Sequence, residues 1–568
     1  MNTMKLLRNH WPLLILLLIV AGGAFLRFWQ MGEIPPGVYP DEAKNANDVL
    51  VSLQSGTYPL FYPENNGREG LFLWLIALAF KWFGVSVASL KLPSAIIGTL
   101  TIVAVYALTK QFFLYAQRDM NASVRLQFSH FAVSAAALLA SGFVAFSFWH
   151  INFSRIAFRA IFVPFLLAAA MAFTFHAART RNLLSISAAA FLWGIGFYTY
   201  IAFRVSIVIP LFVIGATFIL YFFQNPPFKT AGWLKRMYIT DGCWKWDIGA
   251  AVFAATVAPI AFFFATNPGT FTSRSGGISV FDAPQPFTAL LSSISLHLQM
   301  FFFMGDNNWR HNVAGEAQLL WPIAILFLFG ILYALWTTYE GLRYRNWSLV
   351  IAQGALALWF VALLAPAFLT TEGAPHALRA IGVIPVVYLY AAFGFLLLVR
   401  LVFPKQYHRG SVWPFGIIAC VMALLALASF QFNNYFITWG KNPAVADAFS
   451  APYVTMGKYV NDLEYGTHAY IIENIGGVAV TYPAAVRDGN TPLLAMPAQT
   501  TIFIQQTSRR GLTNSHYLTM EELPFALQTP AVIIPLNATE TTKKTLRMRY
   551  PQGDEFIEER FWGYSVPR

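Results

Sequence analysis

The sequence predicts a polytopic α-helical membrane protein that ends in a small extracytoplasmic α/β domain. Of its 568 residues, 57% are hydrophobic and only 11% are charged, whereas soluble domains carry about 25% charged residues. Apolar runs long enough to cross a bilayer core of about 30 Å recur along the first three quarters of the chain. After residue 431 the hydrophobicity falls, and short strand-like segments alternate with Gly, Pro and Asn turns.

Eleven apolar runs are expected to form membrane-spanning helices, because lipid offers no hydrogen-bond partner to an exposed backbone. They cover residues 11–30, 91–112, 129–148, 159–177, 184–202, 205–223, 247–266, 317–337, 348–369, 380–401 and 412–431. The first run follows basic residues, as in a signal peptide. Because this run extends from Trp11 to Trp29 and ends in aromatic residues, we expect an uncleaved helix with its N-terminus in the cytoplasm.

Basic residues in alternate loops support this topology, since Lys and Arg favour the cytoplasmic side of a membrane. These residues are Arg118, Arg125, Arg179, Arg181, Lys229, Lys235, Arg236, Lys245, Arg343, Arg345, Lys405 and Arg409. The net charge of +12 therefore indicates membrane orientation rather than nucleic-acid binding. The two cysteines, Cys243 and Cys420, fall in a cytoplasmic loop and in a span, so no disulfide framework is expected.

Two long outer loops follow from this topology, at residues 31–90 and 267–316. Within the first loop, LFLWLIALAFKWFG (71–84) is apolar but too short for a span. If it crossed the membrane, the later basic loops would face outward, so we expect an interfacial juxtamembrane helix. A second, amphipathic juxtamembrane helix is expected over 42–54. The predicted domains are a transmembrane domain (1–432) and an extracytoplasmic domain (433–568), which is long enough for its own core.

Charged residues that remain on the outer face need a physical reason, because they are costly near lipid unless they pair, reach water or bind a ligand. They are Arg68, Glu69, Arg155, Arg159, Arg204, Arg310, His311, His376 and Arg379. Any single one is explained by a long side chain that extends to the interface as an anchor. As a group on one face, they indicate a site for an anionic lipid headgroup, since the planar guanidinium of Arg suits phosphate.

Asp41 and Glu42 stand side by side in VYPDEAKNAND (38–48), just beyond the first expected span. One interpretation is a helix start, because Pro40 fits the first helical position and acidic residues there interact favourably with the helix dipole. The other is a general base that accepts a hydroxyl proton in a transition state. Adjacent side chains point to different sides of a helix, so only one of the two carboxylates would be the base, and the other would orient it.

Six segments together resemble the polyprenyl-phosphate-dependent membrane glycosyltransferases of the GT-C fold. They are YPDEA, GREGLFLWLIALAFKWFG, LKLPSAIIGTLTIVAVYALTK, WHINFSRIAFR, GDNNWRHNVAG and GAPHALRAIGVIP. The family includes protein O-mannosyltransferases and the lipid A aminoarabinose transferases, and the chain is similar to glycosyltransferase family 39. The resemblance covers about residues 30–400, while the C-terminal domain resembles nothing specific.

The resemblance implies that a monosaccharide passes from a polyprenyl-phosphate donor to an acceptor hydroxyl with inversion, at the outer face of the cell (plasma or inner) membrane. It implies that Asp41 is the base and Glu42 its neighbour. Arg310, His311, Arg155 and Arg379 become candidates for stabilising the phosphate, with His376 beside them and Arg204 as a weaker one. Where relatives carry Pro at the start of the second juxtamembrane helix this chain has Gly70, so the roles of Arg68 and Glu69 stay open.

Metal dependence and the partners are less specified. Asp41, Glu42, Asp306 and His311 are ligand types for a divalent metal, but they show no tight ligand spacing. The expected partners are the lipid-linked sugar, membrane lipids and an acceptor that is a protein, a lipid or a glycan. The sugar, the prenyl length and the role of the C-terminal domain are not specified by the sequence.

Three other functions compete with glycosyl transfer. A lipid-linked sugar flippase or polysaccharide polymerase would share the spans and the outer cations, but it would not need the carboxylate pair. A transporter predicts inverted repeats and charges near mid-membrane, and neither is evident in the sequence. A non-catalytic scaffold would use the external domain to bind a partner.

Overall fold

The computed structural model describes residues 2–119, 129–224, 242–271, 279–404, 413–481 and 493–567. The chain divides into two compact units. We call Met1–Trp29, Ser94–Ser154 and Phe158–Tyr435 the helical unit, and Gln30–Pro93, Arg155–Ala157 and Phe436–Arg568 the mixed unit. Several basic loop residues used for the topology lie outside the described residues: Arg125, Lys229, Lys235, Arg236, Lys405 and Arg409.

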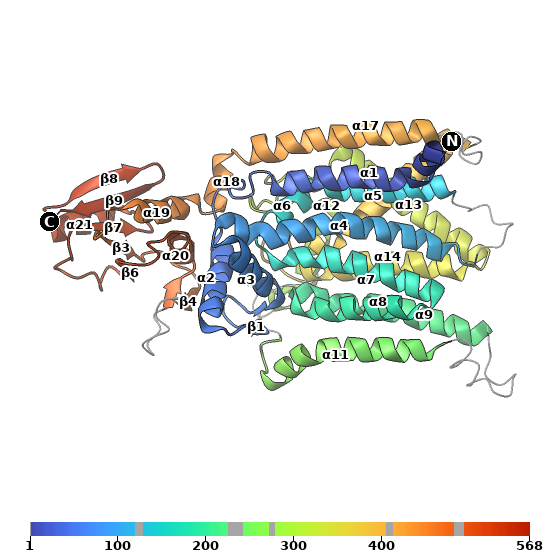
Figure 1. Cartoon of the computed structure of the whole chain (residues 1–568), viewed down its shortest axis with the longest axis horizontal. Coiled ribbons are helices and arrows are strands. Elements are labelled where there is room, and N and C mark those ends of the chain that lie inside the picture. The colour runs from blue at the N-terminus through green and yellow to red at the C-terminus, as the bar shows by residue number, and fades with distance from the viewer. Residues whose placement is uncertain are drawn as a thin grey trace. The chain divides into compact units, whose positions relative to one another are not determined.

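The helical unit is built from long apolar helices that lie lengthwise alongside one another (Figure 1). The long helices and the shorter ones between them are α1 (Asn2–Phe28), α4 (Val87–Ala116), α5 (His130–Ala145), α6 (Phe148–Ser154), α7 (Phe162–Thr180), α8 (Leu183–Ile195), α9 (Val208–Gln224), α11 (Trp244–Thr266), α12 (Pro286–Gln299), α13 (Trp321–Arg343), α14 (Trp347–Phe368), α15 (Ile384–Val402) and α17 (Trp413–Phe432). Short 3₁₀ turns join several of them, at η1 (Arg159–Ile161), η2 (Gly196–Tyr198), η3 (Ile201–Ile207), η6 (Val280–Asp282) and η7 (Ile381–Val383). The π-helical segment η8 (Asn433–Trp439) continues α17. The helix α5 packs against both α1 and α15, and α8 packs against α7 and α11.

Among the described residues, nine helices are long and apolar enough to cross a membrane. The protein is therefore an integral membrane protein, and the predicted fold class is confirmed. Each of the other two predicted spans, 129–148 and 184–202, coincides with a shorter apolar helix, at His130–Ala145 and Leu183–Tyr198. The total of eleven spans stays a prediction.

Glycines let the helices α13 and α15 pack backbone to backbone. A Cβ atom on Gly330 would lie 1.7 Å from the carbonyl oxygen of Tyr390, and one on Gly394 would lie 1.9 Å from that of Leu326. No side chain fits either gap. Small residues permit this close approach where neighbouring helices are surrounded by lipid and gain little from hydrophobic burial.

The mixed unit joins the first long loop to the C-terminal region. The loop supplies α2 (Pro40–Ser55), the short strands β1 (Phe61–Tyr62) and β2 (Arg68–Glu69), and α3 (Leu71–Phe83). The helices α2 and α3 match the two helices expected at 42–54 and 71–84, and their position along a membrane surface stays a prediction. On the other side, Asn47 of α2 donates a hydrogen bond to Gln499 across 2.8 Å, so the loop packs directly on the C-terminal residues.

The C-terminal region contains a five-stranded mixed sheet with the strand order β6-β3-β7-β9-β8. The strands are β3 (His468–Ile472), β6 (Ser515–Leu518), β7 (Ala531–Pro535), β8 (Asp554–Glu558) and β9 (Phe561–Val566), and β4 (Ala479–Thr481) pairs separately with β5 (Leu493–Ala495). The helices here are α18 (Pro443–Ala448), α19 (Ala451–Asp462), α20 (Ala498–Gln506) and α21 (Glu540–Arg549). Buried apolar side chains cover both faces of the larger sheet, which agrees with the predicted α/β domain.

Candidate functional site

Asp41 lies in the first turn of α2, where the chain leaves an extended conformation at Tyr39 and Pro40 opens the helix. Its side chain is half-buried. The Oδ1 atom accepts a hydrogen bond from Asn65 Nδ2 across 2.9 Å. Within the described part of the chain, Oδ2 has neither a hydrogen-bond nor an ion-pair partner. One oxygen of Asp41 is thus held in place while the other is left to accept a proton.

Glu42 differs from its neighbour in every one of these respects. It is fully buried. Its Oε1 accepts a hydrogen bond from the backbone N–H of Ala157 at 2.7 Å, and its Oε2 accepts one from that of Tyr39 at 3.1 Å. Burial raises the pKa of Glu42, although the nearby Lys91 ammonium and the two backbone N–H groups oppose that shift. The carboxylate of Glu42 therefore fastens the start of α2 and, because it is buried, is not placed to meet an acceptor hydroxyl.

Arg68 is buried inside a charged network that ties the β1–β2 hairpin to α2. Its Nη1 donates to Asn45 Oδ1 across 2.9 Å, and its Nη2 forms an ion pair with Asp48. Lys44 reaches the same carboxylate at 2.6 Å and pairs with Glu64 at 2.5 Å. The guanidinium expected at a phosphate is thus occupied by partners within the protein.

The two residues that follow Arg68 are equally constrained. Glu69 is buried in β2, opposite Phe61 of β1. Gly70 donates its N–H to the carbonyl of Leu60 at 2.8 Å, and a Cβ at this position would lie 2.4 Å from the carbonyl oxygen of Pro59. The hairpin therefore approaches Gly70 too closely for any other residue.

Arg155 is also buried and binds the chain that follows α1. Its Nη2 donates to the carbonyl oxygens of Gln30 at 3.0 Å and Ile34 at 2.7 Å. Its guanidinium lies 4.8 Å from the centroid of the Phe436 ring. These contacts give Arg155 a structural role in the mixed unit.

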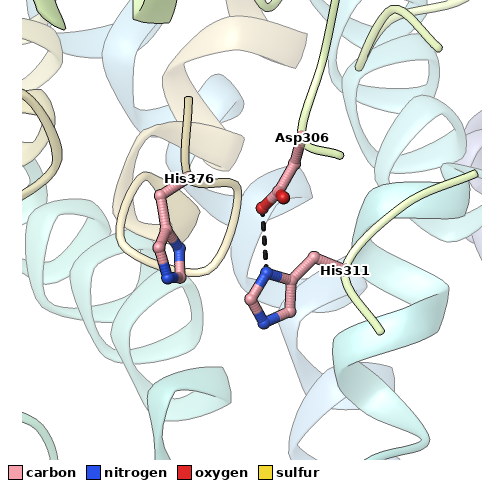
Figure 2. Close-up of side chains that lie close together, drawn as sticks. All are labelled: Asp306, His311 and His376. Carbon is pink, nitrogen blue, oxygen red and sulfur yellow. Dashed lines mark hydrogen bonds and ion pairs between the residues drawn. The ribbon is translucent and has the colours of Figure 1, made fainter. Parts of the chain in front are cut away.

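The helical unit contains a second cluster, made of Asp306, His311 and His376 (Figure 2). Asp306 Oδ2 accepts hydrogen bonds from His311 Nδ1 at 2.8 Å and from the backbone N–H of Ala377 at 2.8 Å. Its Oδ1 accepts one from the backbone N–H of Asn308 at 2.8 Å. The His311 and His376 rings lie 4.8 Å apart, centroid to centroid. The cluster thus joins the loop after α12 to the loop before α15.

His297, at the end of α12, fixes the backbone of His376. The His297 Nδ1 lies 2.8 Å from the carbonyl oxygen of Ser293 and must donate to it. Its Nε2 accepts the backbone N–H of His376 across 3.0 Å. One nitrogen donates and the other accepts, so His297 is a neutral imidazole with its proton on Nδ1.

Burial also lowers the pKa values of His297, His311 and His376. Removal from water is the main cause for all three residues, because it disfavours the charged imidazolium. For His311 the Asp306 carboxylate opposes the shift. For His376 the neighbouring cations, including Arg379, add to it, and the pKa lies well below the usual value of 6.5. The cluster therefore presents neutral imidazoles at neutral pH.

The remaining predicted cations differ in the ion pairs, hydrogen bonds and ring contacts that they form. Arg379 pairs with Glu372 at 2.8 Å and donates to Thr370 Oγ1 at 2.7 Å. Arg310 donates from Nε to Asn308 Oδ1 at 3.3 Å. Arg204 lies 4.4 Å from the centroid of the Phe271 ring. Outside this set, Arg159 lies 5.5 Å from the centroid of the Tyr200 ring.

The structure thus brings the predicted residues together in two groups. Asp41, Glu42, Arg68, Glu69 and Arg155 belong to the mixed unit, and Arg310, His311, His376 and Arg379 to the helical unit. Sequence reasoning missed Lys44, Asp48, Glu64, Lys91 and His297. The spacing of Lys44 and Asp48, four residues apart on one helix, was a usable signal, whereas no local pattern distinguishes His297.

No protein-family model matches the chain, and no curated protein matches it in sequence. Solved structures resemble it in fold. ArnT from Cupriavidus metallidurans bound to undecaprenyl phosphate superposes with a TM-score of 0.51 and 12% identity, over 97% of this chain and 97% of that chain. The chain has the GT-C fold.

Two further structures show lower similarity to this GT-C chain. The apo state of the same ArnT gives a TM-score of 0.49 at 12% identity, again over 97% of each chain. The apo oligosaccharyltransferase of Archaeoglobus fulgidus gives 0.46 at 16% identity and covers 81% of this chain. The chain spans 62% of the length of that oligosaccharyltransferase.

Proposed function

We propose that this chain transfers a monosaccharide from a polyprenyl-phosphate donor to an acceptor hydroxyl, with Asp41 as the general base. The observation that carries the proposal is the contrast between the two adjacent carboxylates. Asp41 is half-exposed, with one oxygen held by Asn65 and the other without a partner among the described residues. Glu42 is buried with both oxygens bonded to backbone N–H groups. Two like residues in different environments take different roles, as acid–base sites commonly require.

In the proposed reaction, the acceptor oxygen attacks the anomeric carbon while Asp41 Oδ2 takes the hydroxyl proton. The bond from the anomeric carbon to the donor phosphate breaks, and its electron pair leaves with the polyprenyl phosphate. Attack opposite the leaving group inverts the anomeric centre. A carboxylate is a weak base, but correct placement compensates because the proton moves only in the transition state.

The donor class rests on the fold. The structure with the TM-score of 0.51 is an ArnT bound to undecaprenyl phosphate. A lipid-linked donor suits a chain whose described residues include nine candidate spans. Arg310 and Arg379 are the proposed phosphate-stabilising cations. Arg68 and Arg155 are proposed to act as structural clamps because their guanidinium groups are already bonded within the mixed unit.

The proposed topology places the N-terminus in the cytoplasm and the C-terminal domain outside it. That domain, proposed at 433–568, covers the site or recognises the acceptor. Under this topology α2 and α3 are the outer juxtamembrane helices.

Release of polyprenyl phosphate from a panel of labelled polyprenyl-phosphate monosaccharides tests the reaction. Purified protein in lipid nanodiscs is incubated with each donor and with membrane extract as the acceptor source. We expect turnover of one donor by the wild type and about 10²–10⁴-fold slower turnover by Asp41→Asn, the range for loss of a general base. Glu33→Gln, which removes an exposed carboxylate of the same unit, serves as the matched control.

Two results would contradict the proposal. Equal turnover by the wild type and Asp41→Asn removes Asp41 as the base. Donor binding without turnover of any donor, together with movement of the labelled lipid between leaflets, favours the flippase instead.

A further inference from the structure

We propose that Asp306, His311 and His376 bind a divalent transition-metal ion in the helical unit. One potential ligand atom from each residue lies within 4.8 Å of the others, and Figure 2 shows the three side chains turned toward a common space. Asp306 and His311 are both only 3% exposed. The atoms Asp306 Oδ2 and His311 Nδ1 are 2.8 Å apart. Two ligand atoms bound to the same tetrahedral zinc ion are about 3.3 Å apart, so these two need to move only slightly.

The ligand types select the class of metal. Two imidazoles and one carboxylate suit Zn²⁺, Fe²⁺ and related ions, whereas Mg²⁺ and Ca²⁺ prefer oxygen ligands throughout. A site with three protein ligands leaves at least one coordination position for water or an anionic oxygen, as in catalytic zinc sites. Such a site differs from a closed structural one, which uses four protein ligands.

The proton that now lies between His311 and Asp306 does not block this binding. In the hydrogen-bonded arrangement of the structure, His311 carries its proton on Nδ1 and donates a hydrogen bond to Asp306. When the ion enters, this proton moves to Nε2, and Nδ1 and Oδ2 each bind the metal instead of each other. His311 stays neutral throughout, as a metal-bound imidazole must be.

Neighbouring groups hold the three residues in advance. The backbone N–H of Ala377 donates to Asp306, and that of His376 donates to His297, so two consecutive peptide groups are fixed by side chains from one segment. Asn152 of α6 donates to the carbonyl oxygen of Arg310 at 2.6 Å, which fixes the loop that carries His311. Such supporting bonds are typical of metal sites, where they orient the ligands.

Metal titration of purified protein in detergent tests the site directly. The protein is stripped with a chelator and titrated with Zn²⁺, with Co²⁺ as a spectroscopic probe and with Mg²⁺ as the oxygen-preferring comparison. We expect the wild type to bind about one Zn²⁺ per chain, with visible absorption of bound Co²⁺ and no binding of Mg²⁺ at equal concentration. Mass spectrometry of the desalted protein counts the bound metal.

Three variants and one control locate the site. We expect His311→Gln and His376→Gln to bind Zn²⁺ at least about tenfold more weakly than the wild type. Asp306→Asn keeps one oxygen that can accept from Ala377, but it loses the charge and the acceptor for the N–H of Asn308. Its metal affinity should therefore fall, and its thermal unfolding without added metal is measured beside it to separate that loss from a change in folding. His130→Gln removes an exposed imidazole at the start of α5 and leaves the affinity unchanged.

Two outcomes overturn the proposal. The first is wild-type protein that binds no Zn²⁺ or Co²⁺ above the level of the His311→Gln variant. The second is an unchanged affinity in His376→Gln and Asp306→Asn when both variants elute as folded protein and unfold cooperatively. Loss of glycosyl transfer in these variants without any metal binding would assign Asp306 and His311 to a proton relay instead.

Discussion

Asn65 donates a hydrogen bond from its side-chain amide to Oδ1 of Asp41, across 2.9 Å. Asn65 adopts a left-handed backbone conformation, with φ of 52°, which Asn tolerates better than most residues. The turn after β1 thereby places a donor against the carboxylate in the first turn of α2. This contact restricts rotation of Asp41 and directs its other oxygen away from Asn65.

Replacement of Asn65 by Asp tests whether this contact tunes the base. The new carboxylate keeps the size and tolerates the left-handed conformation, but it cannot donate to Oδ1 and it places a like charge beside Asp41. We expect donor turnover to be about tenfold slower, because Asp41 loses the contact that orients it. Asn66→Asp, at an exposed left-handed neighbour, should leave turnover unchanged, and an equal loss in both variants would contradict the assignment.

Glu42 should make folding stability depend on pH in a specific direction. Its pKa is raised in the folded protein, mainly by burial. As the pH rises, Glu42 therefore loses its proton in the unfolded protein before it does so in the folded protein. Its contribution to stability is complete at pH values below the pKa of Glu42 in the unfolded protein, and it is lost as the pH rises through the pKa of Glu42 in the folded protein. Relative to Glu42→Gln, which cannot ionise, the wild type should become more stable as the pH falls from 7 to 5. Thermal unfolding followed by tryptophan fluorescence measures this difference, and the opposite slope would contradict the raised pKa.

Arg68 is predicted to support the fold of the mixed unit. Replacement by Met leaves the Asp48 carboxylate without one of its cationic partners inside the protein, and breaking a buried pair costs about 3–5 kcal/mol. We expect a correspondingly lower midpoint in thermal unfolding. The double variant Arg68→Met, Asp48→Leu should recover part of that loss, because the carboxylate that lost its guanidinium partner is also removed. A stable Arg68→Met that fails only to bind the donor would instead support a direct phosphate contact.

The close packing of α13 on α15 gives a prediction in the helical unit. A methyl group at Gly394 would lie 1.9 Å from the carbonyl oxygen of Leu326, so Gly394→Ala must push the two helices apart. We expect destabilisation of about 1–3 kcal/mol, as for overpacked cores. Gly215→Ala is the control, since nothing lies within 4 Å of its added methyl group, and it should be neutral or slightly stabilising because Ala favours helix. Similar unfolding midpoints for the two variants would show that the helices tolerate the added group.

Local sequence patterns were sufficient for much of the architecture. The apolar runs predicted the long helices because a bilayer requires continuous hydrophobic segments and internal hydrogen bonds. The amphipathic pattern at 42–54 and the short apolar run at 71–84 predicted α2 and α3. Asp41 and Glu42 stood out because two adjacent acidic residues follow Pro40 at a helix start, which is a local feature.

The roles of individual charges depended on contacts between distant segments. From the sequence, Arg68 and Arg155 were candidates for binding the phosphate. In the structure both are buried and bonded to protein atoms. Glu42 and Asp41 are chemically alike and adjacent, and contacts with other segments distinguish them. The N–H of Ala157, more than a hundred residues away along the chain, bonds to Glu42, whereas Asn65 bonds to Asp41. Likewise Asp306 and His376 lie in two different loops, and no spacing in the sequence predicts that these loops come together. A periodic pattern predicts whether a residue prefers lipid, protein or water as its surroundings. The specific partner of a charged residue depends on which remote segments the packed helices and loops bring together.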